Sequence, residues 1–137
     1  MTSFDTAMQT SVSGLRAQTK RLRVVAENLA NADTTSDRPG GDPYRRKTIS
    51  FASELDRGTG AEEVTIKKIG RDSSDFKRSY EPGHPSADED GYVLRPNVNT
   101  LVEMMDMQEA QRSYEANLTM LTSARSMLQR TIDLLRS

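Results

Sequence analysis

Residues 98–137 read VNTLVEMMDMQEAQRSYEANLTMLTSARSMLQRTIDLLRS. In this stretch, apolar residues recur at alternating steps of four and three, the pattern of a helix that packs along another helix. Asn99 or Thr100 suits the N-cap, and Glu103 and Asp106 suit the positive end of the helix dipole. We therefore predict one long helix over 98–137, about 50 Å in length. Its predicted seam consists of Met104, Met107, Gln111, Tyr114, Leu118, Leu121, Arg125, Leu128, Ile132 and Leu135.

A second apolar stripe lies beside this seam on the same predicted helix. A single seam serves a single partner helix, so the second stripe predicts contact with neighbouring subunits. The residues of this stripe, which we take as intersubunit candidates, are Ala110, Met120, Ala124, Met127 and Leu134.

The N-terminal region, residues 1–32, shows the same heptad pattern and predicts a second long helix. Gly14 lies inside this pattern and costs a helix about 1 kcal/mol relative to Ala, which indicates close approach of another backbone. Asn28 and Asn31 favour caps and turns, so we expect the helix to end near Ala32. The predicted seam of this helix consists of Met8, Val12, Leu15, Thr19, Leu22, Ala26 and Leu29.

Residues 33–97 form a middle region of different character. Its loops are marked by Pro and Gly, first in residues 37–43 and again in the turn at 81–85. Residues 47–51 and 63–69 alternate imperfectly and predict two short strands separated by a turn at 58–60. A last strand is expected near 91–95. The fold prediction is mainly α with a small β-rich middle, in which the terminal helices form an antiparallel coiled-coil hairpin.

Three heptads of each helix can be paired in such a hairpin. This pairing places Met8 near Ile132 and Leu29 near Gln111, and the first turns of the second helix, residues 98–107, then project past the end of the first.

Composition indicates a protein that needs partners. The chain of 137 residues holds 34% hydrophobic residues and seven aromatic ones, which is little material for a self-contained core. Lys and Arg total 19 against 20 for Asp and Glu, so the charge balance favours neither nucleic acid nor an anionic membrane.

The residues offer little for catalysis or metal binding. His84 is the only histidine and lies in a Pro-bracketed turn. Read as a calcium loop from Asp88, the sequence has Val93 where glycine is required and Asn99 where glutamate is required. The paired glycines lack the context of a phosphate-binding loop, and the basic residues 45–47 lack interleaved aromatics. With no cysteine present, we predict no catalytic, metal or cofactor site and no small-molecule substrate.

The first fifteen residues show no secretory signal peptide. Composition alone therefore indicates a cytoplasmic protein.

Several stretches resemble the axial proteins of the bacterial flagellum. SGLRA at 13–17 followed by NLANADTT at 28–35 is similar to the signature shared by rod and hook subunits. PYRRK at 43–47, YEPGHPSADEDGYV at 80–93 and PNVN at 96–99 narrow the resemblance to the flagellar basal-body rod protein C (FlgC) family, a proximal rod subunit. EMMDM at 103–107 and RSYEAN at 112–117 complete it, while residues 36–42 and 52–63 depart from the family pattern.

This resemblance implies a structural, non-enzymatic subunit of the proximal rod, the base of the torque-transmitting drive shaft. The implied partners are copies of itself, other rod subunits, the membrane ring at the base of the rod with its adaptor, and the flagellar type III export apparatus. The implied location, which replaces the cytoplasmic one, is the periplasmic part of the basal body, reached without a cleaved signal peptide. The resemblance also gives Asn28 and Asn31 an intersubunit hydrogen-bonding role.

Two other functions are alternatives to a rod subunit. An intracellular helical-hairpin adaptor would also use two long helices, and detection in purified basal bodies separates it from a rod subunit. A peptidoglycan hydrolase is rejected, because the sequence offers no acid/base pair.

Overall fold

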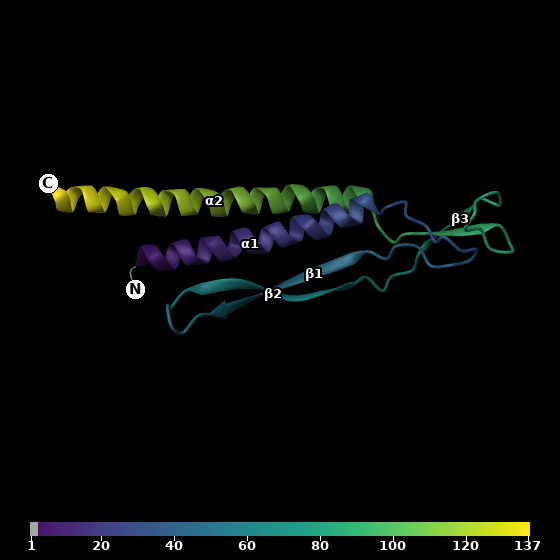
Figure 1. The fold of residues 1–137 in the computed structure, drawn as a ribbon, viewed down its shortest axis with the longest axis horizontal. Coiled ribbons are helices and arrows are strands. Elements are labelled where there is room, and N and C mark those ends of the chain that lie inside the picture. The colour runs from purple at the N-terminus through teal and green to yellow at the C-terminus, as the bar shows by residue number, and fades with distance from the viewer. Residues whose placement is uncertain (1–2) are drawn as a thin grey trace. The chain divides into compact units, whose positions relative to one another are not determined.

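The computed structural model describes residues 3–137 and has long helices near both ends with strands between them (Figure 1). The elements are α1 (Ser3–Ala30), β1 (Lys47–Leu55), β2 (Glu62–Arg71), β3 (Lys77–Tyr80), β4 (Tyr92–Arg95) and α2 (Thr100–Arg136). The predicted fold class, mainly α with a small β-rich middle, is confirmed.

Local side-chain bonds account for the helix ends. Asn99 is the N-cap of α2, since its Oδ1 accepts hydrogen bonds from the backbone N–H groups of Leu101 and Val102 at 3.1 and 3.4 Å. Helix α1 ends at Ala30, two residues before the predicted end, where Asn31 Nδ2 donates to the Glu27 carbonyl at 2.8 Å. The same carbonyl also accepts the backbone N–H of Asn31 at 3.1 Å, so Asn31 closes the last turn of α1 through both its backbone and its side chain.

The strands form two separate two-stranded sheets, β1–β2 and β3–β4. The predicted turn at 58–60 is confirmed: Gly60 has a φ of 76°, a conformation that favours glycine, and its N–H donates to Asp56 O at 2.7 Å. Strands β1 and β2 are longer than predicted, and β4 matches the strand expected near 91–95. The sequence did not predict β3, whose residues Lys77–Tyr80 are mostly polar and pair antiparallel with β4.

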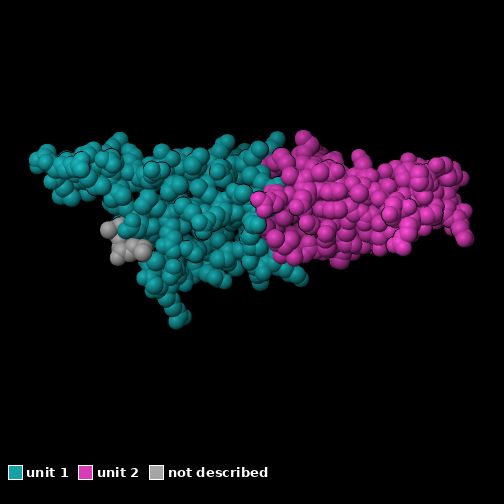
Figure 2. All heavy atoms as spheres, viewed as in Figure 1, with its two compact units in different colours: residues 1–22, 50–68, 108–137 teal, residues 23–49, 69–107 magenta. Residues whose placement is uncertain are grey.

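Two compact units make up the chain (Figure 2). Unit 1 contains residues 1–22, 50–68 and 108–137, of which 1–2 lie outside the described residues; unit 2 contains residues 23–49 and 69–107. The predicted division was a helix over 1–32, a middle over 33–97 and a helix over 98–137. Both units draw on all three of those regions, because each helix contributes to both.

In unit 1, α1 lies between α2 and the β1–β2 hairpin (Figure 1). On one side Gly14 packs against Asn117 of α2, and on the other Val64 N donates to Ser13 Oγ at 3.0 Å. Gln9 Nε2 donates to Glu63 Oε1 at 2.5 Å and so adds a second bond to the hairpin. Among the described residues, no helix is long and apolar enough to cross a membrane.

Candidate assembly surface

Small residues line the buried face of α1. Ser11, Gly14 and Ala17 are buried, whereas Met8, Val12 and Leu15 of the predicted seam are only half-buried. Further along α1, Val24, Val25 and Asn28 are buried, while Leu22 and Leu29 are half-buried and Thr19 and Ala26 are exposed. The buried face of α1 is therefore rotated from the predicted seam, because small side chains let the neighbouring elements approach closely.

The buried face of α2 is rotated in the same way. Tyr114, Leu121 and Leu128 of the predicted seam are half-buried, but Leu118, Ile132 and Leu135 are exposed. Their places are taken by Ala110 and Ala124, both buried, and by Asn117. The packed line still keeps steps of four and three, and consists of Glu103, Met107, Ala110, Tyr114, Asn117, Leu121, Ala124 and Leu128.

The two helices are antiparallel in unit 1, where Gly14 meets Asn117 and Arg21 pairs with Glu109 at 3.3 Å. The predicted pairing places Gly14 beside Ser126 instead, so the observed register differs from it by about two and a half turns. As a result, the last turns of α2 extend past the first residue of α1 (Figure 1). The predicted overhang at residues 98–107 is wrong, because in unit 2 Glu103 lies beside Asn28 of α1.

A buried polar cluster in unit 2 joins α1, β1 and α2, and we call it the Glu103 cluster. Glu103 and Asn28 are both 0% exposed. Arg46 Nε donates to Glu103 Oε1, and Asn28 Nδ2 donates to Glu103 Oε2 at 3.4 Å. Asn28 Oδ1 accepts from Tyr44 Oη at 2.7 Å and from the Lys47 N–H at 2.9 Å. The Asn28 amide is thus bonded within the chain, in place of the intersubunit role that the resemblance gave it.

Arg46 bridges the Glu103 cluster to two further carboxylates, Asp72 at 3.4 Å and Asp106 at 3.8 Å. Burial works to lower the pKa of Arg46, but its hydrogen bond and attraction to Glu103 outweigh this and raise that pKa above the usual value. The guanidinium therefore stays charged, as a buried carboxylate partner requires.

Within residues 3–137, four carboxyl groups have a pKa below the usual value. Hydrogen bonds from Lys47 and Arg95 lower the pKa of Glu27 and Glu81 respectively. Backbone N–H bonds, from Gly58 to Asp56 and from Ser74 to Asp72, lower the pKa of the two aspartates.

These shifts predict acid destabilisation. When folding lowers the pKa of a carboxyl group, the ionised group stabilises the folded state, and this stabilisation is fully present above the unfolded-state pKa of about 4. It is lost as pH falls through the lower pKa of the folded state. We expect the urea midpoint of the purified chain to be flat from about pH 7 to 5 and to fall below about pH 4. Glu81→Gln should make that fall shallower. A midpoint that does not change on acidification would contradict the prediction.

Exposed apolar side chains on α2 form a candidate assembly surface. Met120, Met127 and Leu134 follow each other at steps of seven and are 58%, 53% and 76% exposed, so they line one flank of the packed face of α2; we call them the Met column. Leu118 and Ile132 are exposed on the other flank. Of the remaining intersubunit candidates, Ala110 and Ala124 are buried inside the chain. Asn31 is half-buried and accepts from Thr34 Oγ at 3.1 Å.

Two family models match the chain, one at each terminal helix. The flagella basal body rod protein model matches residues 8–36, and the flagellar basal body rod FlgEFG protein C-terminal model matches residues 89–134. The flagellar basal-body rod protein FlgC of Agrobacterium fabrum is 52% identical over 137 residues, covering 100% of this chain and 99% of the relative. The chain belongs to the FlgC family.

More distant FlgC relatives match over nearly as much of the chain. FlgC of Salmonella typhimurium is 42% identical over 122 residues, which cover 89% of this chain and 90% of the relative. FlgC of Bacillus subtilis is 40% identical, covering 98% of this chain and 99% of the relative. The matched FlgC regions thus include α1, α2 and the strands between them.

The Glu103 cluster was missed by sequence reasoning, although a signal was present. Glu103 occupies the heptad line that continues through Met107 and Ala110, where a carboxylate is buried only with a partner. The basic residues 45–47 lack the pattern of a nucleic-acid site, but two of them have carboxylate partners in the chain: Arg46 pairs with Glu103 and Lys47 with Glu27. An acid on an apolar line and a basic group in the adjoining loop could have predicted the pair.

Proposed function

We propose that this chain assembles into the flagellar rod through the exposed faces of its terminal helices, against copies of itself and other rod subunits. The observation that supports this most is the Met column, which is apolar, exposed and aligned beside the packed face of α2. A large exposed apolar patch is unusual on a monomeric protein and marks an interaction surface. Methionine side chains adapt to different partners, which suits a subunit with unlike neighbours.

A rod transmits torque, and long helices that contact their neighbours along their length suit this role. We propose that the chain forms part of the torque-transmitting drive shaft at the base of the rod, next to the membrane ring and its adaptor. We also propose the periplasmic part of the basal body as its location, export by the flagellar type III apparatus without signal-peptide cleavage, and no enzymatic activity. The names of the FlgC relatives support the place in the basal-body rod, since each is called a basal-body rod protein.

Met127→Lys tests the role of the Met column. In the free chain Met127 is exposed, so the substitution should change the free energy of unfolding by no more than about 0.5 kcal/mol. In an assembled rod a neighbour would bury the charge, and a cost of several kcal/mol would lower incorporation by about a hundredfold. The measurement is the amount of the variant in basal bodies purified from a strain that lacks the native protein, together with swimming.

Ser126→Lys is the matched control, because Ser126 is exposed on the side of α2 that faces away from the packed line. It should incorporate normally. Both variants should be exported equally, which separates secretion from assembly. Normal incorporation of Met127→Lys would show that the Met column faces solvent in the rod. Absence of the wild-type chain from basal bodies would contradict the proposed function itself.

A further inference from the structure

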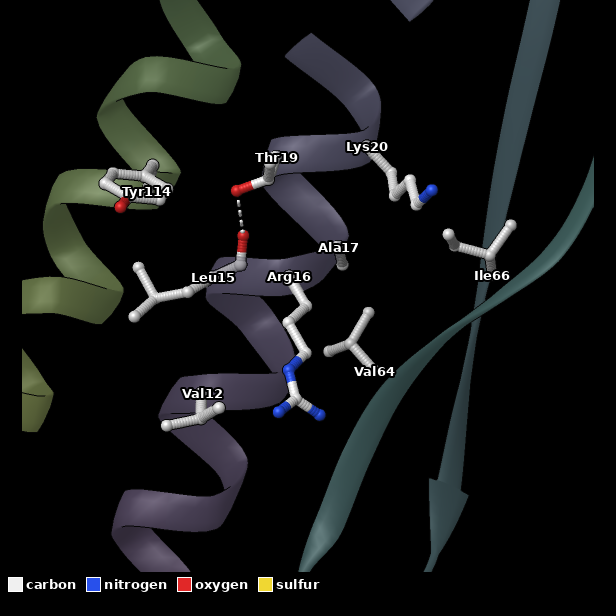
Figure 3. A pocket seen from close by; sticks show the side chains of 9 residues that line it. All are labelled: Val12, Leu15, Arg16, Ala17, Thr19, Lys20, Val64, Ile66 and Tyr114. Carbon is white, nitrogen blue, oxygen red and sulfur yellow. Dashed lines mark hydrogen bonds between the residues drawn. The ribbon is translucent and has the colours of Figure 1, made fainter. Parts of the chain in front are cut away.

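An open apolar hollow of about 400 Å³ lies on unit 1 (Figure 3). Helix α1 forms its floor, Tyr114 of α2 lies at one side, and Val64 and Ile66 of β2 lie at the other. Its lining residues are Val12, Leu15, Arg16, Ala17, Thr19, Lys20, Val64, Ile66 and Tyr114. Most of the lining is apolar, so the burial of an apolar side chain in this hollow would be favourable in free energy.

The last turns of α2 carry a matching apolar face. Leu128 is the last residue of the line that packs on α1, Leu135 continues that line seven residues later, and Ile132 lies on its flank. Past the start of α1 this face has no partner among residues 3–137, and Ile132 and Leu135 are 40% and 82% exposed. The polar residues Gln129, Arg130, Asp133 and Arg136 share the opposite side. We call residues 129–136 the overhang.

We propose that the overhang of one copy lies in the hollow of a second copy. This deepens the proposed function and rests on it, because it names the neighbour and the contact by which copies assemble. The overhang cannot fill the hollow of its own chain, since α2 is one continuous helix and Ile132 lies about 27 Å along it from Tyr114. Its apolar face is the continuation of a face already packed on α1, so the surface it fits is one built on α1.

The charges of the hollow favour the same occupant. Arg16 and Lys20 are its charged lining residues, and neither forms an ion pair within residues 3–137. The C-terminal end of a helix carries partial negative charge and free carbonyl groups. The free carbonyl groups of the last turn would therefore be stabilised between these two cations, with Arg136 of the same turn on the polar side of the overhang, away from them.

This contact joins two different surfaces, and so it is heterologous. A heterologous contact repeats from copy to copy and builds a ring or an open helical assembly, whereas a self-paired contact stops at two copies. The proposal therefore accounts for growth beyond a dimer through residues on the same unit.

Cysteine crosslinking tests the contact. Because the chain has no native cysteine, only the introduced thiols of this chain can react. A chain carrying both Ile66→Cys and Leu135→Cys is expressed in place of the native protein, and purified basal bodies are treated with a short thiol-specific crosslinker. We expect dimers and higher multiples of this chain. The pair Val64→Cys with Ile132→Cys should give the same products, as a second measurement of one contact.

Asp133→Cys with Ile66→Cys is the matched control, because Asp133 lies on the polar side of the overhang. We expect about tenfold less product from it, because a thiol on the far side of the helix lies beyond the reach of a short crosslinker. Dimers from Leu135→Cys alone would mean that overhangs pair with each other and would overturn the proposal. Basal bodies that contain both double variants but give no multiples would also overturn it, while leaving the proposed function intact.

Discussion

Arg46→Met should lower the free energy of unfolding by about 3–5 kcal/mol, because it leaves the Glu103 carboxylate buried without its charged partner. Glu103 is 0% exposed, and the remaining hydrogen bond, from Asn28 at 3.4 Å, is long. The loss should be seen as a lower urea midpoint, measured by circular dichroism on the purified chain. Release of the loop before β1 should follow, since Arg46 also reaches Asp72 and Asp106.

The double variant Arg46→Met with Glu103→Leu removes both charges together. A buried ion pair can often be replaced by apolar residues at little cost, so this variant should recover most of the stability lost in Arg46→Met. Arg95→Met is the matched control: the side chain of its partner Glu81 is 39% exposed, against 1% for Glu103, so solvent screens the pair and the urea midpoint should change far less. Equal losses from Arg46→Met and Arg95→Met would contradict a special role for the Glu103 cluster.

The helices could be predicted from the sequence because the four-three spacing of apolar residues indicates a helix, whichever line of residues on that helix is packed. Both the packed line of α2 and the predicted seam contain Tyr114, Leu121 and Leu128, and the pattern is satisfied by either. The predicted seam runs through large apolar residues, but Ala110 and Ala124 occupy packed positions instead. Side-chain size therefore decided which of two adjacent lines became the interface.

The register could not be predicted, because it depends on contacts between residues far apart in sequence. Gly14 fits against Asn117, and Asn28 bonds to Glu103, yet neither pair stands out in a hydrophobic pattern. The β1–β2 hairpin was predictable from its glycine turn and alternation. Strand β3 was not, since Lys77, Arg78 and Ser79 give it no apolar period and only its pairing with β4 defines it.

The same rotation explains which residues of the second stripe stay exposed. The stripe was predicted as one surface, but its two alanines are buried in the chain and its methionines are exposed. Met120, Met127 and Leu134 stay available to a neighbour because they lie on the flank of the packed line. The sequence therefore indicated that α2 carries apolar residues outside its packed line, but not which ones.

Gly14→Leu should lower the free energy of unfolding by about 3 kcal/mol, because α1 and α2 meet there without room for a side chain. A Cβ at Gly14 would lie 2.6 Å from Asn117 Oδ1 and 2.7 Å from its Cγ, closer than such atoms approach in proteins. The Asn117 amide cannot turn away freely, since its Nδ2 donates to Ser113 O at 2.9 Å. The helices would have to separate, and the measurement is again the urea midpoint.

A double-mutant cycle shows whether Asn117 is the cause. In a helix interior, replacing glycine with alanine stabilises by about 1 kcal/mol when nothing obstructs the new methyl group. Gly14→Ala should therefore gain little or nothing in the native chain but about 1 kcal/mol in an Asn117→Ala background, and the difference is the coupling energy of the contact. Ala26→Gly, at an exposed position of α1, is the control and should cost about 1 kcal/mol. If Gly14→Ala stabilises both backgrounds equally, the helices do not meet at Gly14, and the register that carries the overhang past α1 fails with it.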